Sequence, residues 1–192
     1  TLKLARYRLV YDELFTLELA MALRRRGIKD EAGISFKIGA NVDTHIRNLI
    51  PFALTKAQER VIHELAEDMR SPKPMNRLLQ GDVGSGKTVV ATMAAVMALQ
   101  SGFQTAIMAP TELLARQHAE TIYDLLQPVG MADKLGLLVG GLKPAQKRAA
   151  HERIASGDMQ VIVGTNALIQ EKVDMHRLGL VVVDEQHRFG VE

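Results

Sequence analysis

The sequence predicts an α/β fold in which a doubly wound parallel sheet follows an amino-terminal helical extension. From residue 51 onward, short and continuous apolar runs alternate with longer segments whose apolar residues recur at helical spacing. Continuous apolar runs are typical of strands that helices cover on both faces, and the alternation favours parallel strands with right-handed crossovers. Apolar residues make up 47% of the 192 residues, which is enough to build the core of an ordinary domain.

Residues 1–50 are interpreted as a helical linker or extension from a preceding domain. Apolar residues between Leu9 and Met21 recur at helical spacing, and three arginines precede Gly27, as is typical of a helix C-terminus. This part ends with a loop-like stretch and a short helical piece before Pro51. It carries no catalytic or binding motif. Because the chain starts without methionine inside a helical pattern, we interpret it as part of a longer protein.

Residues 51–192 are expected to form one domain that is cut short after an acidic motif. We expect helices at residues 55–69, 88–100, 112–126 and 145–155, and strands at residues 77–80, 105–110, 134–140, 160–165 and 178–185. In doubly wound sheets, ligands bind beyond the carboxyl ends of the strands. The motifs described below fall at such ends.

The overall charge of the chain is close to neutral. The 24 basic and 22 acidic residues give a net charge of 24 − 22 = +2, so any surface for nucleic acid must be local. Lys147, Arg148 and Arg153, on an expected helix, are interpreted as a solvated face. The absence of cysteine excludes disulfides and thiolate metal sites and fits a reducing compartment. We find no signal-peptide pattern and no apolar stretch of the ~20 residues that crossing a membrane requires.

Residues 81–88, GDVGSGKT, match the phosphate-loop pattern G-x-x-x-x-G-K-[ST]. Glycines allow backbone N–H groups to surround anionic oxygens, and the helix that follows adds its positive amino end. Lys87 can reach the β- and γ-phosphates, and the Thr88 hydroxyl can bind Mg²⁺. The alternative is a glycine-rich turn that matches by chance. The pattern lies between an expected strand and an expected helix, however, which is the context that phosphate binding requires.

An acidic pair follows the last expected strand, in the run LVVVDEQH. Asp184 could hold Mg²⁺ through water, and Glu185 could polarise an attacking water molecule. Taken alone, such a pair is more often a helix cap or a solvated turn. Together with a phosphate loop, it favours hydrolysis over passive binding. The two motifs therefore predict an ATPase lobe with ATP and Mg²⁺ as its cofactors.

Four further segments allow two interpretations each. Gln58 could contact an adenine edge, although Thr55 and Gln58 also form the T-x-x-Q pattern of a helix capping box, which the local pattern favours. Thr111 and Thr165 could bind nucleic-acid phosphates, or they could be an N-cap and part of a strand exit. The glycines at 140–141 allow either a close backbone approach or a turn.

The ordered set of motifs resembles the first motor lobe of superfamily 2 helicases, over about residues 50–192. Within that superfamily, the runs GDVGSGKT, APTELLARQH, VGTNALIQ and DEQHRFGV are similar to the RecG family of bacterial ATP-dependent DNA helicases. The transcription-repair coupling translocases are the nearest alternative, and they usually have glutamate where this chain has Gln186. The resemblance implies a RecA-like P-loop NTPase fold, with residues 1–50 as the linker from a wedge domain.

The resemblance also implies roles for individual residues. Catalysis would depend on Lys87, Asp184 and Glu185, and the metal would be bound by Thr88 and Asp184. Gln186 and His187 would couple the nucleotide state to DNA and to a partner lobe. The nucleotide would contact Phe52, Gln58, Gly81, Gly84, Ser85, Gly86, Lys87, Thr88 and Asp184. DNA would contact Thr111, Glu112, Arg116, Gly141 and Thr165.

By the same resemblance, the parent protein is expected to be an ATP-dependent DNA helicase or translocase. It would remodel branched DNA, such as stalled replication forks and Holliday junctions, in recombination and repair. The expected partners are branched or duplex DNA and, within the parent chain, a second motor lobe and a wedge domain. We expect a monomer in the bacterial cytoplasm, associated with the nucleoid and not with a membrane.

Three other functions fit the motifs less well. A nucleotide-gated DNA-binding module without motor activity would not need Glu185. A metabolic kinase should carry an acceptor pocket and an arginine-bearing lid, and an RNA helicase usually has aspartate where His187 stands. Since an arginine from a second lobe can be worth ~10³–10⁵ in rate, we expect the isolated chain to bind nucleotide weakly and to hydrolyse it barely.

Overall fold

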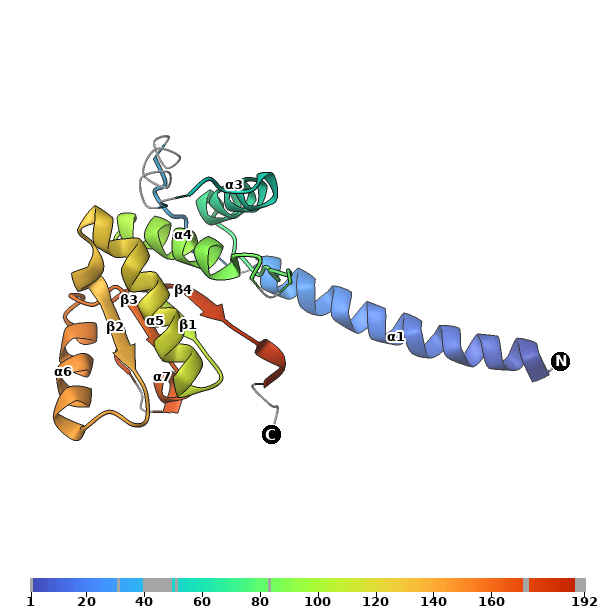
Figure 1. Ribbon diagram of the computed structural model, residues 1–192. Helices are drawn as coiled ribbons and strands as arrows, with labels where there is room; N and C mark the ends of the chain where they lie inside the picture. Colours follow the sequence, from blue (N-terminus) through green and yellow to red (C-terminus); the bar gives the residue numbers. More distant parts are fainter. Residues whose placement is uncertain are drawn as a thin grey trace.

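The computed structural model describes residues 2–30, 32–39, 50, 52–82, 84–170 and 173–188 (Figure 1). Within these residues, a four-stranded sheet carries helices on both faces, and a long helix, α1 (Leu2–Asp30), extends away from it. The strands are β1 (Gln104–Met108), β2 (Leu135–Leu138), β3 (Val161–Gly164) and β4 (Leu178–Val183). The remaining helices are α3 (Lys56–Arg70), α4 (Lys87–Gln100), α5 (Glu112–Leu126), α6 (Pro144–Ala155) and α7 (Ala167–Gln170), with 3-10 turns at Gln127–Val129, Ala132–Lys134 and Gln186–Arg188.

The sheet is parallel throughout and has the order β2-β3-β1-β4. The central strand β1 pairs with β3 through Ile107 and Val163, and with β4 through Ile107 and Val182. Helices connect the strands in the order β1, α5, β2, α6, β3, α7 and β4. This arrangement confirms the predicted doubly wound fold, and it agrees with the prediction for four strands and for the helices α3, α4, α5 and α6. The short helix α7 was not predicted.

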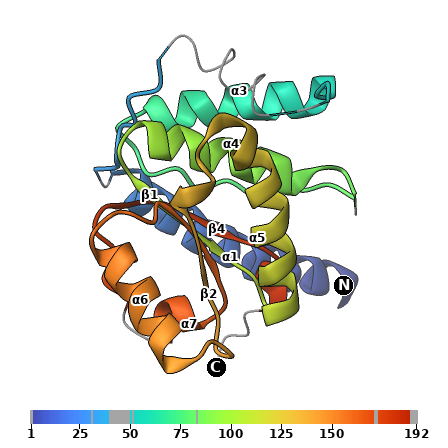
Figure 2. The same cartoon turned by 60° about the vertical axis from the view of Figure 1, so that its left-hand side comes forward.

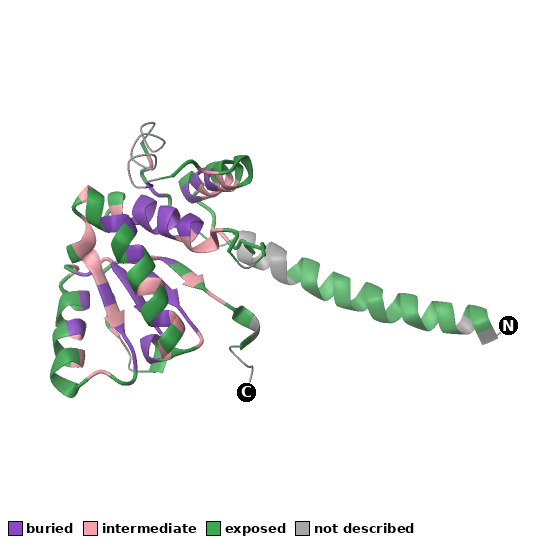
Figure 3. Cartoon of the chain, viewed as in Figure 1, coloured by how far each residue is buried: buried purple, intermediate pink, exposed green. Residues whose placement is uncertain are grey.

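The side chains of β1 alternate between two cores because successive residues of a strand point to opposite faces. Ile107 belongs to the main core, which is formed with α3, α4 and α5. Ala106 and Met108 belong to a second core under α6 and α7. Both faces of the central strands are therefore buried, as Figure 3 shows, which accounts for their continuous apolar sequence.

The helix α4 is apolar on nearly all sides because it lies between the sheet and α3. Its residues from Val89 to Ala98 are buried almost without interruption. The outer helix α3 lies beside α4 (Figure 2) and packs with its buried residues Ile62, Ala66 and Met69. Two layers of helix thus cover one face of the sheet and fix the position of the amino end of α4.

Part of the predicted extension contributes to the main core. The Phe36 ring is buried and meets the Phe103 ring edge-on, with the centroids 5.1 Å apart. The Phe36 N–H donates to the Met69 carbonyl over 2.8 Å, and Ile50 is also buried in this core. The domain boundary at residue 50 stays a prediction. The short helix expected before Pro51 lies outside the described residues.

The strand predicted at residues 77–80 is not present, and that prediction was wrong. These residues pair with no strand, and 72% of Leu78 is exposed. Arg77 instead pairs with Asp68 and Glu64 on α3, which draws the segment toward the helix. The hydrogen bond to Asp68 raises the pKa of Arg77 because it stabilises the charged guanidinium. An apolar run becomes a strand only where a neighbouring strand accepts its backbone hydrogen bonds.

Among the described residues, every helix is too short or too polar to span a bilayer. The long helix α1 has many exposed apolar residues, but charged residues are interspersed among them.

Gln104 is expected to be the most sensitive polar position of the core. Its buried side chain donates to the Ile154 and Met159 carbonyls, over 2.8 and 2.7 Å, and accepts from the Arg177 N–H over 2.9 Å. Gln104→Leu leaves these backbone groups without a partner and should lower the free energy of unfolding by about 3 kcal/mol. Urea denaturation measures the change.

The matched control is Gln117→Leu at an exposed position of α5, which should change stability by less than about 0.5 kcal/mol. Equal stabilities for the two variants would contradict the role of Gln104.

Candidate functional site

The carboxyl ends of the strands bring distant segments of the chain to one edge of the sheet. The Ala109 N–H donates to the Gly164 carbonyl over 2.8 Å, and the Asp184 N–H donates to the Met108 carbonyl over 2.9 Å. The pairing of Leu138 with Gly164 places the end of β2 at the same edge. The segments predicted to bind DNA and metal therefore start from neighbouring points, as ligand sites of doubly wound sheets do.

The phosphate loop leaves the amino end of α4 open. Gly84 and Gly86 both have φ of 80°, a left-handed conformation that side-chain-bearing residues rarely adopt. Gly86 is the N-cap of α4 and provides no side-chain cap, whereas Thr55 caps α3 and Thr111 caps α5 with their hydroxyls. The first N–H groups of a helix lack intrahelical partners and attract anions. The loop thus has the local geometry of an anion site.

The predicted phosphate-binding lysine lies within this loop. The Lys87 ammonium donates to the carbonyls of Gly81, over 2.6 Å, and Asp82, over 2.9 Å. A Cβ atom on Gly81 would come within 2.7 Å of the Ser85 hydroxyl, so a larger residue there would displace this side chain. The loop carbonyls hold the cation next to the open end of α4, where it can contact a bound anion.

Gln58 is both a helix cap and a contact of the phosphate loop. Thr55 and Gln58 form the capping box that the local pattern favoured, with the Thr55 N–H donating to Gln58 Oε1 over 2.9 Å. Gln58 Nε2 donates to the Ser85 carbonyl over 2.9 Å and lies where a Cβ atom on Gly86 would collide with it. Gln58 thereby ties α3 to the loop. Phe52 is about half exposed, and adenine contacts by these two residues stay a prediction.

The acidic motif follows β4 directly. Asp184 is partly buried, and Glu185 has φ of 50°, the only left-handed residue other than glycine in the described part of the chain. Such backbone strain is concentrated at functional sites. Gln186 is exposed and begins a 3-10 turn, while the side chain of His187 lies outside the described residues.

The residues predicted to bind the metal fit Mg²⁺ in their chemistry. Mg²⁺ in nucleotide sites takes one or two protein oxygens and otherwise phosphate and water, so a dense cluster of ligands is not required. Asp184 offers a carboxylate and Thr88 a hydroxyl, and the described residues contain no group of three or more metal-binding side chains. Lys87 contacts loop carbonyls and Asp184 contacts His118, and no ion pair joins the two. Their action on one nucleotide stays a prediction.

Two of the predicted DNA contacts touch each other. Glu112 Oε1, in the first turn of α5, accepts from the Gly141 N–H over 2.7 Å. Thr111 is the N-cap of α5, as the alternative interpretation held, and its hydroxyl accepts from the Leu114 N–H over 3.3 Å. Arg116 is exposed on the same helix. Thr165 follows β3, and its carbonyl accepts from the Leu168 N–H in the turn that begins α7.

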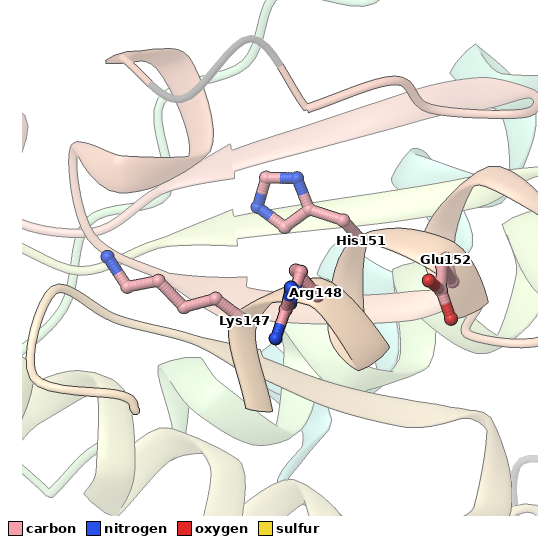
Figure 4. Close-up of a pocket in the computed structure, with 4 residues that line it drawn as sticks. All are labelled: Lys147, Arg148, His151 and Glu152. Carbon is pink, nitrogen blue, oxygen red and sulfur yellow. The ribbon is translucent and has the colours of Figure 1, made fainter. Parts of the chain in front are cut away.

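Figure 4 shows two residues of the basic face predicted on α6, Lys147 and Arg148. Lys147, Arg148, His151 and Glu152 line a shallow hollow on this helix, so both signs of charge are present. The guanidinium of Arg153 donates to the Asp133 carbonyl over 2.9 Å. The mixed charge agrees with a solvated face.

Sequence reasoning missed His118. Its imidazole comes from the middle of α5 and lies 2.7 Å from the Asp184 carboxylate. The two positions are separated by 66 in the sequence, and no local pattern signals this contact. Only the parallel register of the sheet and the helical phase of α5 bring them together.

Comparisons with known proteins support a relation to helicases. The DEAD/DEAH box helicase family matches residues 55–192. The chain is 46% identical over 184 residues to an ATP-dependent DNA helicase RecG from Aquifex aeolicus, which covers 96% of this chain and 23% of the relative. It is 45% identical over 192 residues to the protein of the same name from Bacillus subtilis, covering 100% of this chain and 28% of the relative.

Solved structures agree with this relation. A structure of RecG bound to a three-way DNA junction matches with a TM-score of 0.86 and 45% identity, over 98% of this chain and 26% of that one. A hypothetical ATP-dependent RNA helicase from Sulfolobus tokodaii has a TM-score of 0.55 and 22% identity, over 77% of this chain and 41% of that one, which supports the fold alone. The chain thus spans about a quarter of the length of the RecG relatives.

Glu112 is expected to hold the loop after β2 in place. Glu112→Ala removes the acceptor of the Gly141 N–H, and a charge-assisted hydrogen bond is worth about 1.5 kcal/mol. The hydrogen-exchange rate of the Gly141 amide should therefore rise roughly tenfold, as measured by NMR. Glu120→Ala, at an exposed position of the same helix, serves as the control and should leave this rate unchanged. A Gly141 rate unaffected by Glu112→Ala would show that the contact does not order the loop.

Proposed function

The chain belongs to the DEAD/DEAH box helicase family, and on that premise we propose that it is the ATP-binding motor lobe of an ATP-dependent DNA helicase of the RecG type. The resemblance to RecG that the motifs indicated is confirmed by identities near 45% over the whole chain. The observation that carries the proposal is the amino end of α4, which lacks a side-chain cap and where two left-handed glycines and Lys87 give the loop the local geometry of an anion site.

In this proposal, the loop residues bind the phosphates of ATP. The N–H groups of Gly86, Lys87 and Thr88 would point at phosphate oxygens, and Lys87 would exchange its loop carbonyls for the β- and γ-phosphates. Positioned charge of this kind supplies most of the catalysis of phosphoryl transfer. Mg²⁺, when bound by Thr88 and Asp184, would neutralise charge on the phosphates.

Glu185 would orient and polarise the attacking water molecule. It follows Asp184 directly, so a group that acts on water lies next to the predicted metal ligand. Its left-handed backbone turns the chain sharply after β4 and gives its side chain a different direction from that of a regular strand residue. A carboxylate at this place supports hydrolysis, since nucleotide binding alone does not require one.

The DNA partner would be bound through phosphates at the carboxyl edge of the sheet. Thr111, Gly141 and Thr165 lie in the loops after β1, β2 and β3, and the similar RecG structure is bound to a three-way DNA junction. Backbone contacts carry no sequence information, so binding should be salt-sensitive and selective for branched DNA over a given base sequence. Stalled forks and four-way junctions are the proposed substrates, in recombination and repair.

The remaining parts of the motor would come from the same parent chain. A second motor lobe would close on the nucleotide, and a wedge domain would precede α1, whose apolar residues are exposed here. ATP binding would close the two lobes, and hydrolysis would reopen them, so that the lobes step along DNA. A monomer in the bacterial cytoplasm, near the nucleoid, fits this activity.

ATP hydrolysis by the intact protein, measured with and without forked DNA, tests the proposal. Lys87→Ala should lower DNA-stimulated turnover by roughly a hundredfold or more because a charge on the phosphates is lost. Glu185→Gln should lower turnover by a similar ~10²–10⁴-fold while nucleotide binding is retained, since only the action on water is removed.

The matched controls are Lys73→Ala and Glu120→Gln, both at exposed positions away from the loop. These variants should hydrolyse ATP like the wild type. Turnover that is independent of DNA and unchanged by Lys87→Ala and Glu185→Gln would refute the motor function.

A further inference from the structure

A histidine of α5 contacts the carboxylate that is proposed to bind the metal. His118 Nε2 lies 2.7 Å from Asp184 Oδ2, and the two side chains are 18% and 29% exposed. The pair is therefore screened from solvent more than an ordinary surface contact is. No role for His118 follows from the nucleotide and DNA contacts described above.

The direction of this hydrogen bond is set by chemistry. An ionised carboxylate only accepts, so the Nε2–H of His118 must donate. The Asp184 N–H is at the same time held by the Met108 carbonyl over 2.9 Å. Backbone and side chain of Asp184 are thus both anchored, and the contact with His118 uses only one of the two carboxylate oxygens. Hydrogen-bond partners of this kind orient metal ligands and raise metal affinity.

The amino end of α5 lies in the proposed DNA contact. His118 belongs to the buried face of this helix, between the fully buried residues Ala115 and Ile122. Thr111 and Glu112 begin the helix two turns earlier, about 10 Å along its axis. Glu112 accepts from the Gly141 N–H, so the loop after β2 contacts this end of α5. Because α5 is one continuous helix, a shift of its amino end would carry His118 with it.

We propose that His118 is a positioning residue that holds Asp184 for Mg²⁺–ATP and makes its orientation depend on the placement of α5. This inference rests on the proposed motor function. DNA engaged at the amino end of α5 would stabilise the helix in the position where His118 meets Asp184. The contact would thereby link DNA binding to metal binding without His118 touching DNA, nucleotide or metal.

The test is the Mg²⁺ dependence of binding of a nonhydrolysable ATP analogue and of ATP hydrolysis by the intact protein, each measured with and without forked DNA. His118→Ala and His118→Leu remove the donor, and each should raise the half-saturating Mg²⁺ concentration about tenfold or more and reduce the stimulation by DNA. His118→Gln keeps an N–H donor near the Nε2 position and should restore the wild-type Mg²⁺ dependence to within about threefold. His63→Ala, at an exposed position of α3, is the matched histidine control and should behave like the wild type.

Each outcome either supports or overturns the proposed role of His118. Should His118→Ala fail to fold, His118→Leu fills the space and provides the donor-free variant. The inference is overturned if folded donor-free variants keep the wild-type Mg²⁺ dependence. It is also overturned if their turnover falls equally at every Mg²⁺ concentration, because a uniform loss marks a structural defect. A wild-type protein without DNA-stimulated hydrolysis would overturn the motor function itself, and with it this role. The wild-type measurement thus separates the two failures.

Discussion

The parallel register of β1 with its two neighbours is the constraint on which the candidate site depends. Two backbone hydrogen bonds just beyond the strands, from Ala109 to Gly164 and from Asp184 to Met108, align three strand ends. A shift of one residue in this register would turn every side chain of a strand to the other face, exchanging the residues of the two cores. Since β1 is buried on both faces, such a shift costs too much apolar packing to occur. The same packing that stabilises the domain therefore fixes where the loops that carry the candidate site residues begin.

The helix α4 connects this core to the anion site. It is buried along almost its whole length between α3 and the sheet, so its amino end has little freedom to move. A capping side chain would stabilise that end, but here Gly86 leaves the N–H groups open, while Thr55 and Thr111 cap the helices on either side. The burial of α4 offsets the missing cap. Gln58, which caps α3 and also contacts Ser85, shows how a local structural role and a place in the site can coincide in one residue.

Local sequence pattern predicted most of the helices and strands of this fold. It did not predict contacts between residues that lie far apart in the sequence. The helical spacing of apolar residues predicted α3, α4, α5 and α6 to within a residue or so, and the phosphate-loop pattern predicted the turn before α4. The apolar run at 77–80 was predicted as a strand, yet a strand forms only with a neighbour, and Arg77 pairs with α3 instead. The contact of His118 with Asp184 was missed for the same reason, because it depends on sheet register rather than on spacing.

The central claim is that the phosphate loop and the acidic motif act on one metal-bound nucleotide. Paramagnetic Mn²⁺ in place of Mg²⁺ broadens the NMR signals of nearby nuclei, so it reports which backbone amides surround the cation. With a nonhydrolysable ATP analogue present, Mn²⁺ should broaden the amide signals of both Thr88 and Asp184 at the same low concentration, and neither without the analogue. Broadening of one of these signals while the other stays sharp would place the two motifs at separate sites and contradict the account.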